Sequence, residues 1–371
     1  MKSIRYAPEW RRYKDPVTGT ALLQWTSGNT MNHHFYFTNP PVSADGRTGF
    51  LVSYRNGFPN IYAIDLTSGE LVQITDRTDL NPFSPAPSAD GNSVFFTARN
   101  CLWKLDTRHG ETTALASFAS SRLGICSLNR DGSLLAMGVR HDDWGELVVV
   151  DTVSGNLLVS SREEEVGHVQ FCPIDDTLLL FSGSIGRRIW CHDRRTGRSR
   201  RIVAEGEGEW FVHESWIGGS RKILYVRWPH ALLMVDSGGG EPVELLRINA
   251  WHPRSDAEGK MIVFDTNHPD RGLKLLDIRS GSLVTLCYPG ATLRGSQWRF
   301  DRPSRSAGMD TSIIRSGEPE QDLPPSPDHP ESLYGPQWTH PHPSFTVDAR
   351  SVVFTSDRER YSHVYSVTAS S

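Results

Sequence analysis

Two histidines near the carboxy-terminal end of the chain have the spacing of a metal-binding pair. His340 and His342 are separated by one proline, so on an extended backbone both imidazole rings point to the same face. Imidazole suits divalent first-row metals such as manganese, iron, nickel, zinc and copper. Two surface or packing histidines would give the same spacing, so the pair alone leaves both interpretations open.

Several of the 14 histidines occupy the same position relative to a repeated turn. They lie a few residues before that turn, in the segment expected to form the innermost strand of each repeat, and they are His33, His168, His213, His252 and His342. In a β-propeller the innermost strands line the central channel, and equivalent positions cluster at one mouth. His252 therefore joins the His340–His342 pair as a candidate metal ligand, with the packing interpretation still open.

Two further positions are candidates for acid–base or anion chemistry. His213 lies inside the aromatic segment 210–216 (WFVHESW), where desolvation would lower the pKa of the imidazole and leave a neutral base. A core histidine bonded to a backbone carbonyl fits that segment equally well. Arg187 and Arg188 stand beside a predicted strand, and an arginine pair in such a place is ordinarily solvated.

The elements that must position these residues follow from an internal repeat. A small polar turn, two apolar strands and a second polar turn recur in seven copies, roughly every 40 to 45 residues. The clearest copies begin at the turns 43–46 (SADG), 88–91 (SADG) and 129–132 (NRDG). Alternating strands at this period are typical of propeller blades. We therefore predict an all-β, seven-bladed β-propeller.

The ends of the repeat array predict how the ring closes. The seventh copy, which follows residues 347–349, lacks its outermost strand, and the isolated strand-like segment 20–28 (TALLQWTSG) would supply it. An N-terminal strand that joins the last blade closes the ring and removes exposed sheet edges. We thus expect residues 1–371 to form a single propeller domain. Residues 302–336, rich in Pro, Ser, Asp and Glu, are predicted to form a long loop between blades six and seven, and an eighth blade built on residues 293–301 is the alternative.

Composition excludes several classes of function. The net charge of −4 offers no basic field for nucleic acid or an anionic membrane, and no run approaches the roughly 18 apolar residues that span a bilayer. The five cysteines are scattered without a CxxC pair, so we expect free thiols and a cytoplasmic protein. Phosphate-binding glycine loops and G-x-S-x-G nucleophile motifs do not occur, which leaves nucleotide chemistry and nucleophilic hydrolysis unsupported. Nothing indicates an oligomeric state.

Segments 340–346 (HPHPSFT) and 351–357 (SVVFTSD) resemble the oligogalacturonate lyases of polysaccharide lyase family twenty-two. Further matching motifs occur in the same order along the chain, at 32–37 (NHHFYF), 166–168 (VGH), 188–190 (RIW) and 213–216 (HESW). The resemblance covers essentially the whole chain and implies a cytoplasmic seven-bladed propeller.

The resemblance also implies roles for individual residues. It implies a manganese-type ion held by Gln337, His340, His342 and His252. It implies that His213 is the catalytic base, that Arg188 contacts the substrate near the reacting centre, and that His33 and His168 face the substrate. The expected reaction is β-elimination of short 4-linked galacturonides to 4,5-unsaturated products.

The chain departs from the family at two places. Residues 182–186 (SGSIG) are short where the family carries a longer polar loop with an additional histidine, and the loop between blades six and seven is longer here. A lyase for a different uronic acid, such as a glucuronate-containing oligosaccharide, therefore remains an alternative. A non-catalytic interaction propeller is the other, and it would need neither a metal nor histidines at a fixed blade position.

Overall fold

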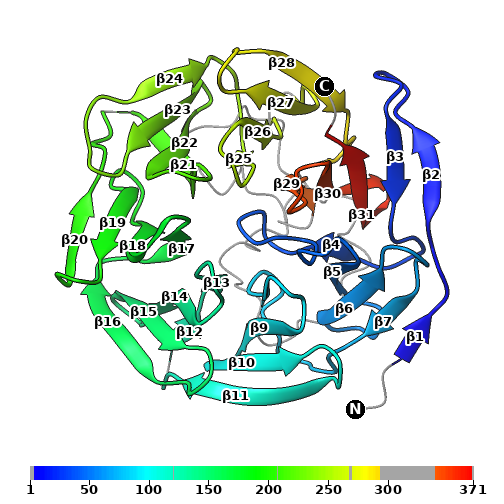
Figure 1. Cartoon of the computed structure of the whole chain (residues 1–371), viewed down its shortest axis with the longest axis horizontal. Helices are drawn as coiled ribbons and strands as arrows, with labels where there is room; N and C mark the ends of the chain where they lie inside the picture. The colour runs from blue at the N-terminus through cyan, green and yellow to red at the C-terminus, as the bar shows by residue number, and fades with distance from the viewer. Residues whose placement is uncertain (1–3, 120, 207, 267–269, 293–338, 370–371) are drawn as a thin grey trace, which may run out of the picture.

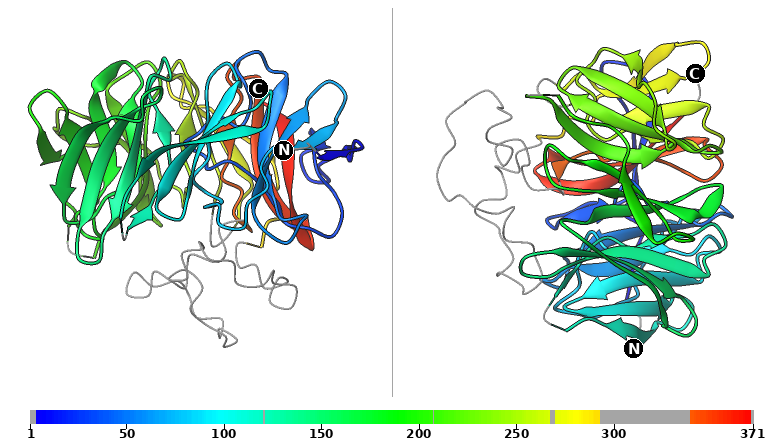
Figure 2. Two further views of the ribbon diagram at one scale, coloured as in Figure 1. Left: turned by 90° about the horizontal axis from the view of Figure 1, so that it is seen from below. Right: turned by 90° about the vertical axis from the view of Figure 1, so that its left-hand side faces the viewer.

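Seven antiparallel sheets are arranged in a ring around a central axis (Figure 1). The structure, a computed structural model, describes residues 4–119, 121–206, 208–266, 270–292 and 339–369. The regular elements in these ranges are all β-strands. Viewed from the side, the strands of each blade run roughly along the axis of the ring (Figure 2). The predicted all-β, seven-bladed propeller is confirmed.

The first four blades follow the chain in order. Blade one contains β4 (Asn32–His34), β5 (Thr48–Ser53), β6 (Asn60–Asp65), β7 (Leu71–Gln73) and β1 (Ile4–Tyr6). Blade two contains β8 (Ala86–Pro87), β9 (Ser93–Ala98), β10 (Cys101–Asp106) and β11 (Glu111–Ser117). Blade three contains β12 (Arg122–Leu123), β13 (Ser127–Leu128), β14 (Leu134–Arg140), β15 (Gly145–Asp151) and β16 (Leu157–Glu163). Blade four contains β17 (Gly167–Cys172), β18 (Asp175–Ser182), β19 (Ile189–Asp193) and β20 (Arg198–Arg201).

The last three blades complete the ring. Blade five contains β21 (Trp210–Trp216), β22 (Lys222–Trp228), β23 (Ala231–Asp236) and β24 (Val243–Leu246). Blade six contains β25 (Arg254–Ser255), β26 (Met261–Phe264), β27 (Leu273–Asp277) and β28 (Leu283–Cys287). Blade seven contains β29 (Ser344–Phe345), β30 (Ser351–Glu359), β31 (Tyr361–Thr368), β3 (Ala21–Gln24) and β2 (Arg11–Lys14).

Blade seven joins the two ends of the chain. Strand β3 pairs with β31, with Leu22 opposite Val367, so the predicted closure by an N-terminal strand is confirmed. The structure adds two strands that the sequence did not predict. Strand β2 extends blade seven on the outside of β3, and β1 pairs with β7 in blade one. Because the amino-terminal segment belongs to two neighbouring blades, it fastens the ring where a gap would otherwise expose sheet edges.

Apolar side chains between neighbouring blades form the core. Phe50 in blade one and Phe96 in blade two are fully buried in one cluster, and Val263 in blade six and Phe354 in blade seven belong to another. Each sheet is therefore covered on both faces, which explains the nearly continuous apolar inner strands. The repeated polar turns start these strands. In the first, the Ser43 hydroxyl donates to Asp45 and Gly46 takes a positive φ of 72° that favours glycine.

Three sequence predictions fall on residues that the structure does not describe. They are the predicted loop 302–336, the alternative eighth blade on 293–301, and Gln337 as a metal ligand. Among the described residues, no helix is long and apolar enough to cross a bilayer.

Leu22 provides a test of the ring closure. Its side chain is 2% exposed in the cluster between blades six and seven, so Leu22→Ala should lower the free energy of unfolding by roughly 2–5 kcal/mol. The matched control is Leu157→Ala on an outer strand, where the leucine is 48% exposed and the loss should stay below about 0.5 kcal/mol. Chemical denaturation measures both, and equal losses would contradict a closing role for β3.

Candidate metal centre

Three of the predicted ligands meet in the central channel. Nitrogen atoms of His252, His340 and His342 all lie within 4.8 Å of one another. The ring centroids of His252 and His342 are 4.0 Å apart, and those of His340 and His342 are 5.6 Å apart. All three residues are buried, with exposures between 0% and 4%. The blades thus bring together histidines that are about ninety residues apart in the sequence.

The hydrogen bonds of His252 prepare one nitrogen for a cation. Its Nδ1–H donates to Asp265 Oδ2 at 2.8 Å, and its backbone N–H donates to Asp265 Oδ1 at 2.7 Å. A carboxylate on Nδ1 fixes the ring orientation and leaves the Nε2 lone pair directed away from it, as in many metal sites. The Nε2 atoms of His252 and His342 are both buried without a hydrogen-bond partner among the described residues. Buried polar atoms of this kind normally have a partner, so this donor set fits a bound cation.

A shared backbone feature sets the direction of three histidines. His168, His213 and His342 have positive φ values of 46°, 54° and 46°, a conformation that residues other than glycine seldom adopt. His168 and His213 lie in irregularities where the ladders β17–β18 and β21–β22 shift register. The His340–His342 pair lies at the irregular entry to β29, just before the strand begins. Such strain is tolerated where a side chain must be aimed, here into the channel.

His213 lies beside the three candidate ligands. Its ring centroid is 4.3 Å from that of His252 and 4.5 Å from that of Trp251. The residue is 4% exposed, and its Nδ1 has no hydrogen-bond partner among the described residues. The indole N–H of Trp251 lies 3.3 Å from His340 Nδ1, so one tryptophan packs against both the candidate base and a candidate ligand.

Burial favours the uncharged form of the His213 and His342 imidazoles. Desolvation lowers the pKa of His213 and of His342 well below the usual imidazole range, and the nearby His252 adds a smaller repulsive effect to each. His34 stands behind His342 and donates from Nε2 to its carbonyl at 2.7 Å. Burial lowers the pKa of His34 to about 3. Neutral imidazoles are the form that binds metals and accepts protons.

His168 and Arg188 form a second group. The Arg188 guanidinium donates to His168 Nδ1 at 3.2 Å and to Glu214 Oε2 at 3.3 Å. The Glu214 side chain is fully buried and also accepts the Ser182 hydroxyl, so the ion pair is fixed from both sides. Burial lowers the pKa of His168 to about 3, with a further effect from Arg188. Arg187, in contrast, pairs with Glu164 on the exposed outer side.

Tyr36 and Phe37 connect the two groups. The Tyr36 ring is 5.4 Å from that of His168 and 5.2 Å from that of His342. The Phe37 ring contacts His213, His252 and His342 at 5.3–6.2 Å. Both residues belong to the loop after β4, which reaches toward the centre of the ring (Figure 1). This loop therefore forms one wall of the histidine cluster.

His33 lies to one side of this arrangement. Its ring stacks on Phe83 at 4.8 Å and approaches Tyr54 at 6.3 Å, rather than meeting the other predicted histidines. Its Nδ1–H donates to the backbone carbonyl of His34, which in turn holds His342. Its link to the cluster among the described residues is thus indirect.

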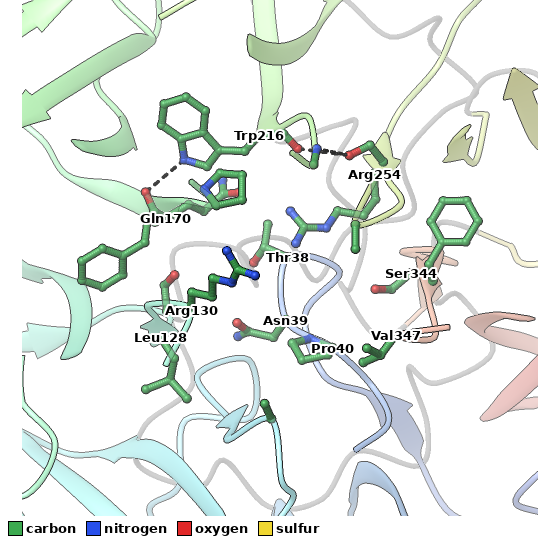
Figure 3. Close-up of a pocket in the computed structure, with 18 of the residues that line it drawn as sticks. Thr38, Asn39, Pro40, Leu128, Arg130, Gln170, Trp216, Arg254, Ser344 and Val347 are labelled. Carbon is green, nitrogen blue, oxygen red and sulfur yellow. Dashed lines mark hydrogen bonds between the residues drawn. The ribbon is translucent and has the colours of Figure 1, made fainter. Parts of the chain in front are cut away.

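A cavity of about 500 Å³ opens along the same channel (Figure 3). Its lining begins two or three residues after the histidines, at Gln170, Trp216, Arg254 and Ser344. None of the predicted site histidines lines it. The cavity therefore lies toward the repeated turns, beyond the histidine cluster.

Sequence reasoning missed residues that hold the site together. Tyr36, Ser182 and Glu214 appear only within longer segments of the sequence analysis, without a role, and Asp265 does not appear in it. The sequence does contain one signal for Asp265. This carboxylate directly follows the apolar run 261–264, so it is buried with the strand and needs a hydrogen-bonding partner there. The contacts of Tyr36 and Ser182 depend on segments that are distant in the sequence, so no local pattern predicts them.

Comparison with characterised proteins gives consistent relatives. No protein-family model matches the chain. An oligogalacturonate lyase of Dickeya dadantii (strain 3937) is 23% identical over an alignment of 398 positions, gaps included. The alignment covers 96% of this chain and 95% of that protein. An oligogalacturonide lyase of Pectobacterium atrosepticum is 24% identical, with 93% and 92% covered. The resemblance that the motifs indicate is therefore confirmed along the whole chain.

Solved structures support the same fold. An oligogalacturonate lyase in complex with manganese superposes with a TM-score of 0.81 at 20% identity, over 99% of this chain and 98% of that one. An oligogalacturonate lyase from Vibrio parahaemolyticus superposes with a TM-score of 0.80 at 21% identity and the same coverage.

Asp265 offers a test of the metal centre. Asp265→Ala removes the acceptor for His252 Nδ1–H and should weaken the affinity for Mn²⁺ roughly 10- to 100-fold, as measured by metal titration. Asp265→Asn, which keeps the volume, should give a smaller loss. Asp142→Ala removes an exposed carboxylate and serves as the control. Unchanged affinity in the Asp265 variants with intact thermal unfolding would contradict a ligand role for His252.

The buried imidazoles predict how stability depends on pH. Burial lowers the pKa of His33 to about 4 from a usual 6.5, so below pH 6.5 the unfolded chain binds protons that the folded chain excludes. The free energy of unfolding of metal-free protein should therefore fall as the pH is lowered from 6.5 toward 4. His33→Gln should reduce this loss by roughly 1.4 kcal/mol per pH unit. The exposed His230→Gln is the control, and identical pH profiles for the two variants would refute the prediction.

Proposed function

We propose that this chain, which resembles the oligogalacturonate lyases from end to end, is a metal-dependent lyase. In this proposal residues 1–371 form one propeller domain that cleaves short 4-linked galacturonides by β-elimination in the cytoplasm. The observation that carries the proposal is the group of three buried histidine nitrogens within 4.8 Å, with the His213 ring 4.3 Å from one of them. Five free cysteines suit a reducing compartment.

β-Elimination requires help at a weakly acidic carbon. The C5 proton of a uronic acid is hard to remove while the adjacent carboxylate keeps its charge. A manganese-type ion would supply Lewis-acid stabilisation of the charge that develops on that carboxylate. His252, His340 and His342 would hold it, with Gln337 as the fourth ligand that the resemblance implies. Neutral imidazole and amide ligands leave the full positive charge of a cation available to an anionic substrate, which a carboxylate-rich site would not.

His213 is the proposed base. Burial holds its imidazole unprotonated, so the ring is ready to accept the C5 proton over a wide pH range. The lowered pKa also makes the ring a weaker base, and a cation beside the substrate carboxylate would offset this by acidifying C5–H. The adjacent Trp251 and Phe37 rings exclude water and fix the direction of the imidazole.

Arg188 and His168 are the proposed substrate contacts. Glu214 and His168 hold the guanidinium in one orientation, and an arginine fixed in this way suits bidentate binding of a sugar carboxylate. The Tyr36 ring lies between His168 and His342, so a uronide bound by Arg188 would be within reach of the metal ligands. His33 has a weaker case, because its ring contacts are with Phe83 and Tyr54.

The segment 182–186 favours a second candidate substrate. It is short where the family carries a longer polar loop, and its first residue, Ser182, bonds to the Glu214 that orients Arg188. A change at this place alters the surroundings of the proposed carboxylate contact. A lyase for another uronic-acid oligosaccharide is therefore the alternative, and a panel of short uronides separates the two by rate.

Two histidine variants test the division of roles. His213→Ala should lower turnover of a short galacturonide by roughly 10²- to 10⁴-fold, because it removes the base, while the bound metal is retained. His342→Ala should lose both metal and turnover. Absorbance of the unsaturated product and metal analysis of the same samples measure the two properties.

His230→Ala provides the control, since this histidine is exposed in the turn between β22 and β23. Full turnover in the His213 variant would refute its role as the base. Metal retained at full occupancy in the His342 variant would refute the ligand set.

A further inference from the structure

The cavity beyond the histidine cluster contains two arginines without an acidic partner. Arg254 in β25 and Arg130 in the turn before β14 both line it. Neither guanidinium makes an ion pair or side-chain hydrogen bond within the described ranges. They come from blades six and three, and Figure 3 shows both turned toward the middle of the cavity. Arg254 is half-buried, and a buried cation without a counter-ion is unfavourable unless a ligand supplies one.

The acidic residue in the lining, Asp256, accepts hydrogen bonds elsewhere. Asp256 uses its Oδ1 to accept the backbone N–H groups of Lys260 at 2.7 Å and Met261 at 3.1 Å. It belongs to the polar turn that starts β26. The cavity therefore keeps an excess of positive charge, and the field in a concave site attracts small anions.

The rest of the lining suits a ligand with both polar and apolar faces. Thr38 presents a hydroxyl beside the arginines, while Trp216 and Phe171 supply aromatic surface. The volume of about 500 Å³ lies within the range of roughly 300–1,000 Å³ that small-molecule sites occupy. An inorganic ion would leave most of this space and surface unused.

The cavity is distinct from the proposed catalytic centre. Phe37 packs against His213, His252 and His342, and the next residue in the chain, Thr38, lines the cavity. Arg188, the proposed carboxylate contact at the catalytic centre, is not part of the lining. Residues 37 and 38 thus separate the catalytic centre, where Arg188 is the proposed carboxylate contact, from the cavity, where Arg254 and Arg130 supply the positive charge.

We propose that this cavity is a second binding site for a small sugar acid, whose carboxylate pairs with Arg254 and Arg130. The choice of a sugar acid rests on the proposed function, because the substrates and products of a uronide lyase carry such a carboxylate, whereas the anion site rests on the two arginines. A ligand here contacts blades three and six and the loop after β4. Binding should therefore raise the thermal stability of the protein.

Calorimetric titration with D-galacturonate tests the site without turnover, because this monosaccharide has no glycosidic bond to cleave. Arg254→Met should weaken binding by roughly tenfold or more, since it removes a charge-assisted contact while keeping much of the side-chain volume. Arg130→Met, at an exposed position, should weaken it less. The control Arg12→Met removes an equal charge from the outer strand β2 and should bind as the wild type does.

Two further arms distinguish the sites and the ligand class. His342→Ala, which disables the proposed metal centre, should leave the Arg254-dependent binding intact, so a failure of the lyase proposal is separable from a failure of this one. D-Galactose, which lacks the carboxylate, should bind much more weakly than D-galacturonate. Equal affinity of wild type and Arg254→Met, with Arg254→Lys confirming a folded protein, would overturn the site. Arg254-dependent binding of inorganic phosphate but not of D-galacturonate would overturn the sugar-acid assignment.

Discussion

The desolvation of closely packed imidazoles is the constraint on which the site depends. The ring centroids of His213 and His342 lie 4.3 Å and 4.0 Å from that of His252, and all three residues are buried. Desolvation lowers the pKa of His213 and of His342, because protonation of either would place a charge beside neighbouring imidazoles in a medium of low dielectric constant. The carboxylate of Asp265 accepts hydrogen bonds from both the Nδ1–H and the backbone N–H of His252. A divalent ion is the charge that such a cluster is best prepared to accept.

The propeller creates this cluster from residues that are far apart in the chain. Each blade repeats the same order of turn and strands, so positions just before the inner strands converge around one axis. The positive φ values at His168, His213 and His342 show that convergence alone is insufficient. Each histidine needs a local distortion of the inner strand to turn its ring into the channel, and the rigid blades absorb the cost. Closure of the ring by β3 keeps the opposing blades at the required distance.

The sequence was informative wherever one pattern repeated. Alternating strands and recurrent turns predicted seven blades, and the missing strand in the last copy predicted the closure by residues 20–28. The same register predicted that His252 would approach His342. Patterns of this kind could not predict β1 or β2, whose partners lie in blades at either end of the chain. They also could not predict Tyr36, which acts through a loop that crosses toward the channel, or the pair Arg254 and Arg130, which two distant blades bring to the same cavity.

The central claim is that the histidine cluster holds a metal ion that a uronide lyase requires. The most direct measurement is the ultraviolet absorbance of the conjugated product during incubation with a short galacturonide, before chelation, after complete removal of divalent metal, and after addition of Mn²⁺. Product should form in the untreated sample, formation should stop in the metal-free protein, and Mn²⁺ should restore it. Product formation that continues at the same rate in fully metal-free protein would show that the histidine cluster holds no ion that the reaction needs.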